Sequence, residues 1–148
     1  MDSKEKQVLV TTISLVIIFM SYSLYIYNTY IVDNISIINS TKFWGKSFLI
    51  LIPVTIVAQI LIHILFAIVN KIITHEDLES ITDERDRFIE LRALRISHWV
   101  FTSGFLLSMV SLVLEMPIYT MFLILIASGF ISGIASGIAK IYYYRKGF

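Results

Sequence analysis

The stretch SFLILIPVTIVAQILIHILFAIVN, residues 47–70, decides the fold of this chain. It runs for 24 residues without an Asp, Glu, Lys or Arg. An α-helix needs about 20 such residues to cross roughly 30 Å of hydrocarbon. A segment in lipid must also satisfy its own backbone hydrogen bonds, and this one shows no strand-like alternation. The stretch therefore predicts a membrane-spanning helix.

Three more charge-free stretches occur, at residues 7–32, 96–114 and 116–139, and every charged residue lies outside the four segments. The composition agrees, because only 16% of the residues are charged and 57% are hydrophobic. A soluble domain normally carries about 25% charged residues. We expect residues 1–148 to form a single all-α membrane domain, a four-helix transmembrane bundle.

The distribution of basic residues predicts the orientation of the helices. Ten of the twelve Lys and Arg residues lie in the N-terminal region, in segment 71–95 or in the C-terminal tail, and only Lys42 and Lys46 lie on the other side. Lys and Arg accumulate on the cytoplasmic side of membrane proteins. We therefore expect both termini inside and loop 33–46 outside. The expected location is the bacterial cytoplasmic membrane.

The net charge of +1 and the absence of cysteine exclude several classes of protein. A near-neutral chain lacks the basic character of a nucleic-acid-binding domain, so we expect no nucleic-acid partner. Without cysteine there is no disulfide, thiolate ligand or cysteine nucleophile. The histidines, His63, His75 and His98, lack the spacing that places two metal ligands on one helical face. No catalytic motif is present, and we expect no enzyme activity, metal or cofactor.

Residues 82–95, TDERDRFIELRALR, predict that the third helix begins in the cytoplasm. Thr82 or Asp83 can cap a helix, and acidic residues fill the first turn. Residues 83–114 would extend roughly 48 Å as a helix, about 18 Å more than the hydrocarbon thickness. The surplus is an amphipathic cytoplasmic segment, which we call the collar.

The collar contains candidate binding residues, because Arg holds phosphate and carboxylate through a planar fork at the depth of the lipid headgroups. One stripe at i, i+3 and i+4 spacing consists of Arg85, Ile89, Arg92, Ile96 and Trp99. The alternative is a solvated surface whose charges pair internally and only set the orientation. Both interpretations concern the same set: Arg85, Arg92, Arg95, Asp83, Asp86 and Glu90.

Several motifs together carry a family resemblance. They are Asp83-Glu84-Arg85-Asp86, Ile89-Glu90-Leu91-Arg92-Ala93-x-Arg95-Ile96, Gln59-x-x-x-His63 and Tyr142-Tyr143-Tyr144-Arg145-Lys146-Gly147. With them the chain resembles, over most of its length, small bacterial four-helix membrane proteins of unknown function. Such proteins are similar to products often encoded beside small helix-turn-helix regulators, so the resemblance implies a role in stress or immunity. It implies no catalytic residues.

A second candidate site lies within the second predicted helix. Gln59 and His63 share one helical face, and Asn70 falls near the same direction at the cytoplasmic end. Polar side chains are costly in lipid, so this face should point into the bundle. The near-neutral pKa of histidine suits a proton relay or a ligand contact. The alternative is a structural hydrogen bond from His63 to a Ser or Thr of a neighbouring helix.

The fourth predicted helix carries a row of small residues. Gly129, Gly133 and Gly137 repeat every four residues, which lets two helix backbones approach closely in lipid. The row favours either packing within one chain or a homo-oligomer that forms through this helix.

Two functions remain open. We expect a non-enzymatic membrane protein that acts in envelope stress, immunity or signalling through the collar, with membrane lipids and a protein at the cytoplasmic loop as partners. The alternative is a small homo-oligomeric transporter or channel that uses the polar face of Gln59 and His63.

Overall fold

A computed structural model describes residues 3–74 and 83–146. In these residues it contains no strand and four long α-helices: α1 Ser3–Ile26, α2 Thr41–Thr74, α3 Glu84–Val113 and α4 Ile118–Lys146. All four helices are long and apolar enough to cross a membrane. The predicted all-α, four-helix, multi-pass fold is therefore confirmed.

Three of the four helices, α2, α3 and α4, are longer than the membrane spans predicted for them. Helix α2 begins at Thr41 rather than at residue 47, and α4 continues to Lys146 rather than ending at residue 139. Helical hydrogen bonding continues past the hydrocarbon because polar side chains at the helix ends can remain solvated. In contrast, α4 begins two residues later than predicted, directly after Pro117. A proline disfavours the α conformation of the residue before it, here Met116, and the Pro117 carbonyl accepts the Thr120 N–H at 2.9 Å.

The start of α3 agrees with the expected cap. The Asp83 carboxylate accepts a hydrogen bond from the Glu84 N–H at 2.7 Å. In return, the Asp86 carboxylate accepts one from the Asp83 N–H at 3.2 Å, which completes a capping box. Thr82, the other candidate for the cap, lies outside the described residues.

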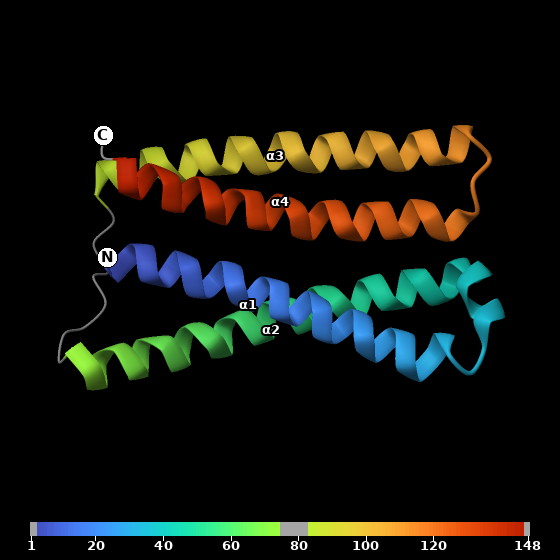
Figure 1. Cartoon of the computed structure of the whole chain (residues 1–148), viewed down its shortest axis with the longest axis horizontal. Helices are drawn as coiled ribbons and strands as arrows, with labels where there is room; N and C mark the ends of the chain where they lie inside the picture. The colour runs from blue at the N-terminus through green and yellow to red at the C-terminus, as the bar shows by residue number, and fades with distance from the viewer. Residues whose placement is uncertain (1–2, 75–82, 147–148) are drawn as a thin grey trace.

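The chain forms two hairpins, α1 with α2 and α3 with α4, which meet where α1 packs on α4 (Figure 1). At the end where α1 and α3 begin, the helices lie in the order α3, α4, α1, α2. Helices α1 and α2 cross near their middle, so at the opposite end the start of α2 lies beside α4. Among the described residues, α2 and α3 have no backbone contact. The beginnings of α1 and α3 lie at the same end of the molecule as the ends of α2 and α4.

The turns at the opposite end are compact. A π-helical turn, Tyr27–Ile31, and a 3-10 turn, Ile35–Asn39, connect α1 to α2. The Trp44 indole donates to the Ile38 carbonyl at 2.7 Å and stacks on the Phe122 ring with centroids 6.2 Å apart. This stacking joins the start of α2 to α4.

Small side chains fill most of the helix interfaces, and large apolar side chains cover the outside. Ala93 and Ser108 are fully buried, whereas Leu49 and Ile73 are each 72% exposed. An apolar exterior is unfavourable in water but is the surface that lipid solvates. The packing therefore agrees with a membrane-spanning bundle.

Candidate functional site

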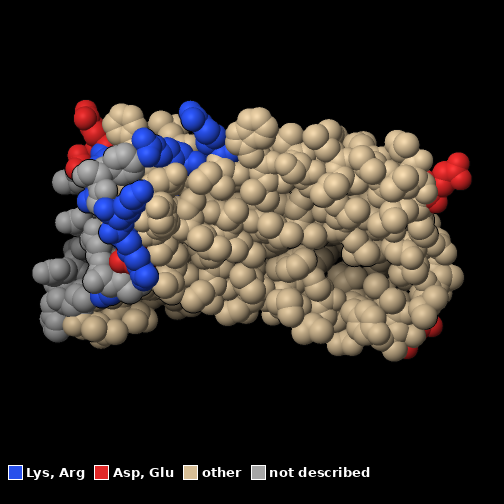
Figure 2. Space-filling view, turned by 45° about the horizontal axis from the view of Figure 1, so that its top comes forward, with Lys and Arg blue, Asp and Glu red and all other residues tan. Residues whose placement is uncertain are grey.

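Charged side chains gather where α1 and α3 begin and α2 and α4 end. On the face drawn in Figure 2, the Lys and Arg side chains lie at this end, and uncharged surface extends to acidic side chains at the far end. The described basic residues at this end come from all four helices. We call this region the charged end.

Ion pairs between described residues of the charged end join different helices. Lys4 of α1 pairs with Asp86 of α3, and their side chains are only 18% and 10% exposed. Glu5, also buried on α1, pairs with Arg145 of α4. The Lys140 ammonium of α4 lies 3.6 Å from the Glu90 carboxylate of α3. The charged end therefore links the two hairpins.

Asp86 takes part in several contacts of this cluster. Its carboxylate completes the α3 capping box, pairs with Lys4 and faces the Tyr144 side chain. A carboxylate that is taken out of water needs several such partners to offset its lost hydration. The start of α3 is thereby fastened to both α1 and α4.

Two collar arginines, Arg85 and Arg92, contact α4. Arg85 donates to the Tyr144 carbonyl at 3.3 Å, and the Arg92 guanidinium lies 5.6 Å from the centre of the Tyr143 ring. The alternative to headgroup binding was that these arginines pair internally with Asp86 and Glu90. Ile89 is buried on α3, which packs on α4, and the arginines one turn before and after Ile89 therefore lie next to the tyrosines of α4.

Two other collar arginines are exposed, and one of them borders a groove. Arg95 and Arg87 both face outward. A groove of about 450 Å³, which we call the end groove, is lined by Arg87, Glu90, Leu91, Leu94, Ser136 and Lys140. Arg87 and Lys140 were not among the site residues predicted from the sequence. The i, i+4, i+7 spacing of Arg87, Leu91 and Leu94, which places the three on one helical face, could have identified Arg87.

Gln59 and His63 of α2 face α1. The Thr11 hydroxyl lies 3.2 Å from His63 Nε2, and the Ser14 hydroxyl donates to Gln59 Oε1 at 3.3 Å. The Gln59 amide also donates to the Thr11 carbonyl at 3.4 Å. These contacts are of the structural kind that the sequence analysis gave as the alternative to a relay. Asn70 lies two turns beyond His63, half-buried near the end of α2.

His63 also borders a polar chamber of about 310 Å³, which is lined by Lys4, Gln7, Val8, Thr11, His63, Asp86, Glu90, Lys140 and Tyr144. The chamber opens among the ion pairs of the charged end and includes residues of every helix. From the sequence, His63 and the collar were predicted as separate sites. The structure brings His63 together with Asp86 and Glu90.

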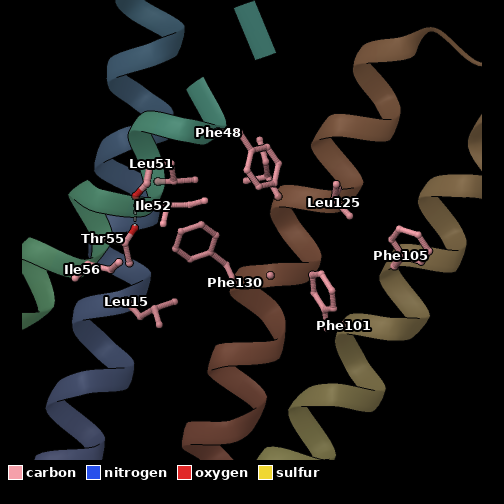
Figure 3. A pocket seen from close by; sticks show the side chains of 12 residues that line it. Leu15, Phe48, Leu51, Ile52, Thr55, Ile56, Phe101, Phe105, Leu125 and Phe130 are labelled. Carbon is pink, nitrogen blue, oxygen red and sulfur yellow. Dashed lines mark hydrogen bonds between the residues drawn. The ribbon is translucent and has the colours of Figure 1, made fainter. Parts of the chain in front are cut away.

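A third hollow, the apolar pocket, lies between the hairpins further from the charged end (Figure 3). Its volume is about 530 Å³, and its walls include Leu15, Leu51, Phe101, Phe105 and Phe130. Thr55 is its one hydroxyl-bearing residue, and that hydroxyl donates to the Leu51 carbonyl at 2.8 Å. The polar lining of the chamber therefore reaches as far as Thr11 and His63, and the pocket further from the charged end is apolar.

The small residues of α4 have three different neighbourhoods. A Cβ added to Gly137 would lie 2.0 Å from the Thr12 hydroxyl oxygen of α1, and one added to Gly133 would lie 3.2 Å from a Leu15 methyl. A Cβ on Gly129 would meet no atom within 4 Å, because Gly129 lines the apolar pocket. Part of the predicted glycine row therefore packs within the chain.

The described residues contain no cluster of three His, Asp or Glu side chains suited to a metal ion. His75 and the acidic residues after it, at the centre of the predicted cytoplasmic loop, lie outside the described residues. His98 is exposed on α3.

The sequence matches no protein-family model and no curated protein, and the fold matches no solved structure.

Proposed function

We propose that this is a non-enzymatic protein of the bacterial cytoplasmic membrane whose charged end binds the anionic headgroups of inner-leaflet lipids. Its termini would lie inside, and the protein would act in envelope stress, immunity or signalling. The resemblance to small bacterial four-helix membrane proteins of unknown function supports that role. The partner would be a protein that binds at the cytoplasmic loop and recognises the lipid-bound form.

The observation that carries this proposal is the convergence of basic side chains at one end of the bundle. Arg87 and Arg95 are exposed there, while Lys140 borders the same groove as Arg87. An anionic leaflet contributes about 1 kcal/mol for each basic residue near its surface. Arg85 and Arg92 are oriented by the α4 tyrosines, which favours a preorganised surface over a mobile one.

Lipid retention tests the proposal directly. Purified protein would be mixed with phosphatidylglycerol or phosphatidylcholine in detergent, and bound lipid counted by native mass spectrometry. We expect Arg95→Gln to reduce phosphatidylglycerol retention about fivefold, with partial recovery in Arg95→Lys, which keeps the charge but loses the planar fork. Lys42→Gln, at the other end, is the matched control. Equal retention of both lipids by the unaltered protein would refute headgroup binding.

The orientation needs its own test, because the proposal requires the charged end inside the cell. Cysteines placed at Ser3, Ser80 and Gly147 should resist an impermeant thiol reagent in intact cells, whereas a cysteine at Ser36 should react. Labelling at Ser80 from outside would place the charged end against the wrong leaflet.

The second candidate function, a homo-oligomeric transporter or channel, is favoured by the polar chamber that reaches His63. The apolar pocket beyond Gln59 argues against a polar path through one chain. Ion flux in proteoliposomes that a His63→Leu variant loses would support transport, and flux equal to that of protein-free vesicles would remove it.

A further inference from the structure

The end groove and the apolar pocket lie along one face of α4. Leu125 and Gly129 line the apolar pocket, and Ser136 and Lys140 line the end groove. These residues are separated by four, seven and four positions, so they share one side of the helix. Gly133, between the two hollows, follows the same spacing.

Helix α3 forms a wall along the same line. Arg87 and Leu94 border the end groove, whereas Phe101 and Phe105 border the apolar pocket. Their separations of seven, seven and four again define one helical face. The two hollows therefore lie one behind the other on the same side of the α3–α4 hairpin, and α1 and α2 cover the deeper one (Figure 3).

The chemistry of the lining changes along this line. At the charged end it presents the Arg87 guanidinium and the Lys140 ammonium beside two exposed leucines, Leu91 and Leu94. At the deep end it presents aromatic and aliphatic side chains, with open space over Gly129. A molecule complementary to both ends has an anionic group joined to a long apolar chain.

We propose that the two hollows form one binding site for an anionic phospholipid. Its phosphate lies between Arg87 and Lys140, and one acyl chain passes Leu91 and Leu94 into the apolar pocket beside Phe101 and Phe105. Gly129 is small because the chain passes over it. The headgroup part rests on the proposed function, whereas the buried chain is an additional claim.

The lining favours an acyl chain over an extended peptide segment. An extended peptide carries backbone N–H and C=O groups that need hydrogen-bond partners in lipid. The hydroxyl of Thr55 is already bonded to the Leu51 carbonyl, and the remaining walls of the apolar pocket are hydrocarbon or aromatic. An acyl chain needs no such partner, and dispersion contacts with the walls suffice.

Glu90, the carboxylate in the end groove, allows a test in which a substitution should increase lipid retention. Glu90 lies 3.6 Å from the Lys140 ammonium, so it competes with a lipid phosphate for that cation. We expect Arg87→Gln to lower phosphatidylglycerol retention about fivefold and Glu90→Gln to raise it. A collar that only holds the helices together would show no gain in the Glu90→Gln variant.

The position of the chain is tested with phosphatidylglycerol that carries a photoreactive diazirine at the end of one acyl chain. After irradiation we expect cross-links at Phe101, Phe105 or Leu125, mapped by mass spectrometry. Gly129→Leu should fill the pocket and reduce these cross-links at least about fivefold, whereas Gly45→Leu should not. Gly45 is the matched control because a Cβ there also meets nothing within 4 Å, outside both hollows.

The outcomes separate this inference from the proposed function. Preferential phosphatidylglycerol retention with cross-links only on the outer surface would overturn the buried chain and leave headgroup binding intact. Pocket cross-links obtained equally with phosphatidylcholine would overturn the anionic headgroup. A dimer that Gly129→Leu abolishes would assign the pocket to a second copy of the chain and overturn the lipid site.

Discussion

The contact between the two helices of a hairpin differs between the two hairpins of this protein. Helices α3 and α4 approach so closely that a Cβ on Gly104 would lie 2.1 Å from the Ser128 Cβ. Helices α1 and α2 are joined by side-chain hydrogen bonds: one between Thr11 and His63, one from Ser14 to Gln59, and one from the Tyr22 hydroxyl to the Ser47 carbonyl at 2.7 Å.

The serines of α3 and α4 make the contrast clearer. Ser108 and Ser128 are buried between these helices, yet each hydroxyl donates to a carbonyl of its own helix, at 2.7 and 2.8 Å. They act there as small residues rather than as links. In lipid no hydrophobic force drives helices together, so close contact and polar bonds are the two available sources of affinity. Away from the charged end, where Arg85 and Glu90 of α3 also contact α4, close contact dominates in the α3–α4 hairpin and polar bonds dominate in the α1–α2 hairpin.

The largest expected effect comes from separating α3 and α4. Gly104→Ala should destabilise the protein by about 2–3 kcal/mol, because the new methyl group overlaps an atom fixed to the α4 backbone. Unfolding in mixed micelles of increasing SDS would measure the loss. Ser128→Gly removes both side-chain atoms nearest that methyl, so the double variant should recover most of the stability. A double variant as unstable as Gly104→Ala would show that the contact is not the cause.

The next largest effect concerns the link between the hairpins. Lys4→Met should cost about 2 kcal/mol, because Asp86 is 10% exposed and would lose its cation. Adding Asp86→Asn should restore part of the stability, since the amide oxygen can still accept the Asp83 N–H. The comparison is Glu90→Gln, which breaks a pair whose carboxylate is 61% exposed and should change stability by less than about 1 kcal/mol. Equal losses in the two single variants would contradict this ranking.

The fold was predictable because the membrane imposes it. Charge-free stretches of sufficient length can only be spanning helices, and the cap at Asp83 has a local signature of acidic residues in the first turn. The true helix ends at Thr41 and Lys146 were not predictable from hydropathy, since helices continue into water where their side chains are polar.

The candidate sites were only partly predictable. The spacing of Gln59 and His63 indicated a shared inward face, and the structure places that face on α1. Lys4 pairs with Asp86, which lies 82 positions further along the chain, and Glu5 pairs with Arg145, which lies 140 positions further. Such partners follow from which helices become neighbours, and no spacing rule along one helix contains that information. For the same reason, the joining of His63 to the charged end was missed.

A smaller effect is expected where α1 meets α4. Gly137→Ala should cost about 1–2 kcal/mol, because Thr12 must turn away and give up its 2.8 Å hydrogen bond to the Val8 carbonyl. Gly133→Ala should cost less, since a Leu15 methyl can move. Gly129→Ala should be neutral or stabilising, because it adds helix propensity in open space. The same SDS titration ranks the three, and a large loss in Gly129→Ala would contradict the pocket geometry.

The smallest effect is expected for the hydrogen bonds between α1 and α2. A double-mutant cycle with Thr11→Val and His63→Leu isolates the contact of 3.2 Å between the two side chains. Interhelical hydrogen bonds in membranes average about 0.6 kcal/mol, because the separated helices find other partners for the same groups. We expect a coupling energy near that value, several-fold below the loss in Gly104→Ala. A coupling above about 2 kcal/mol would mean that the polar hairpin is held as firmly as the close-packed one. In that case His63, rather than Gly104, would be the residue on which the bundle depends.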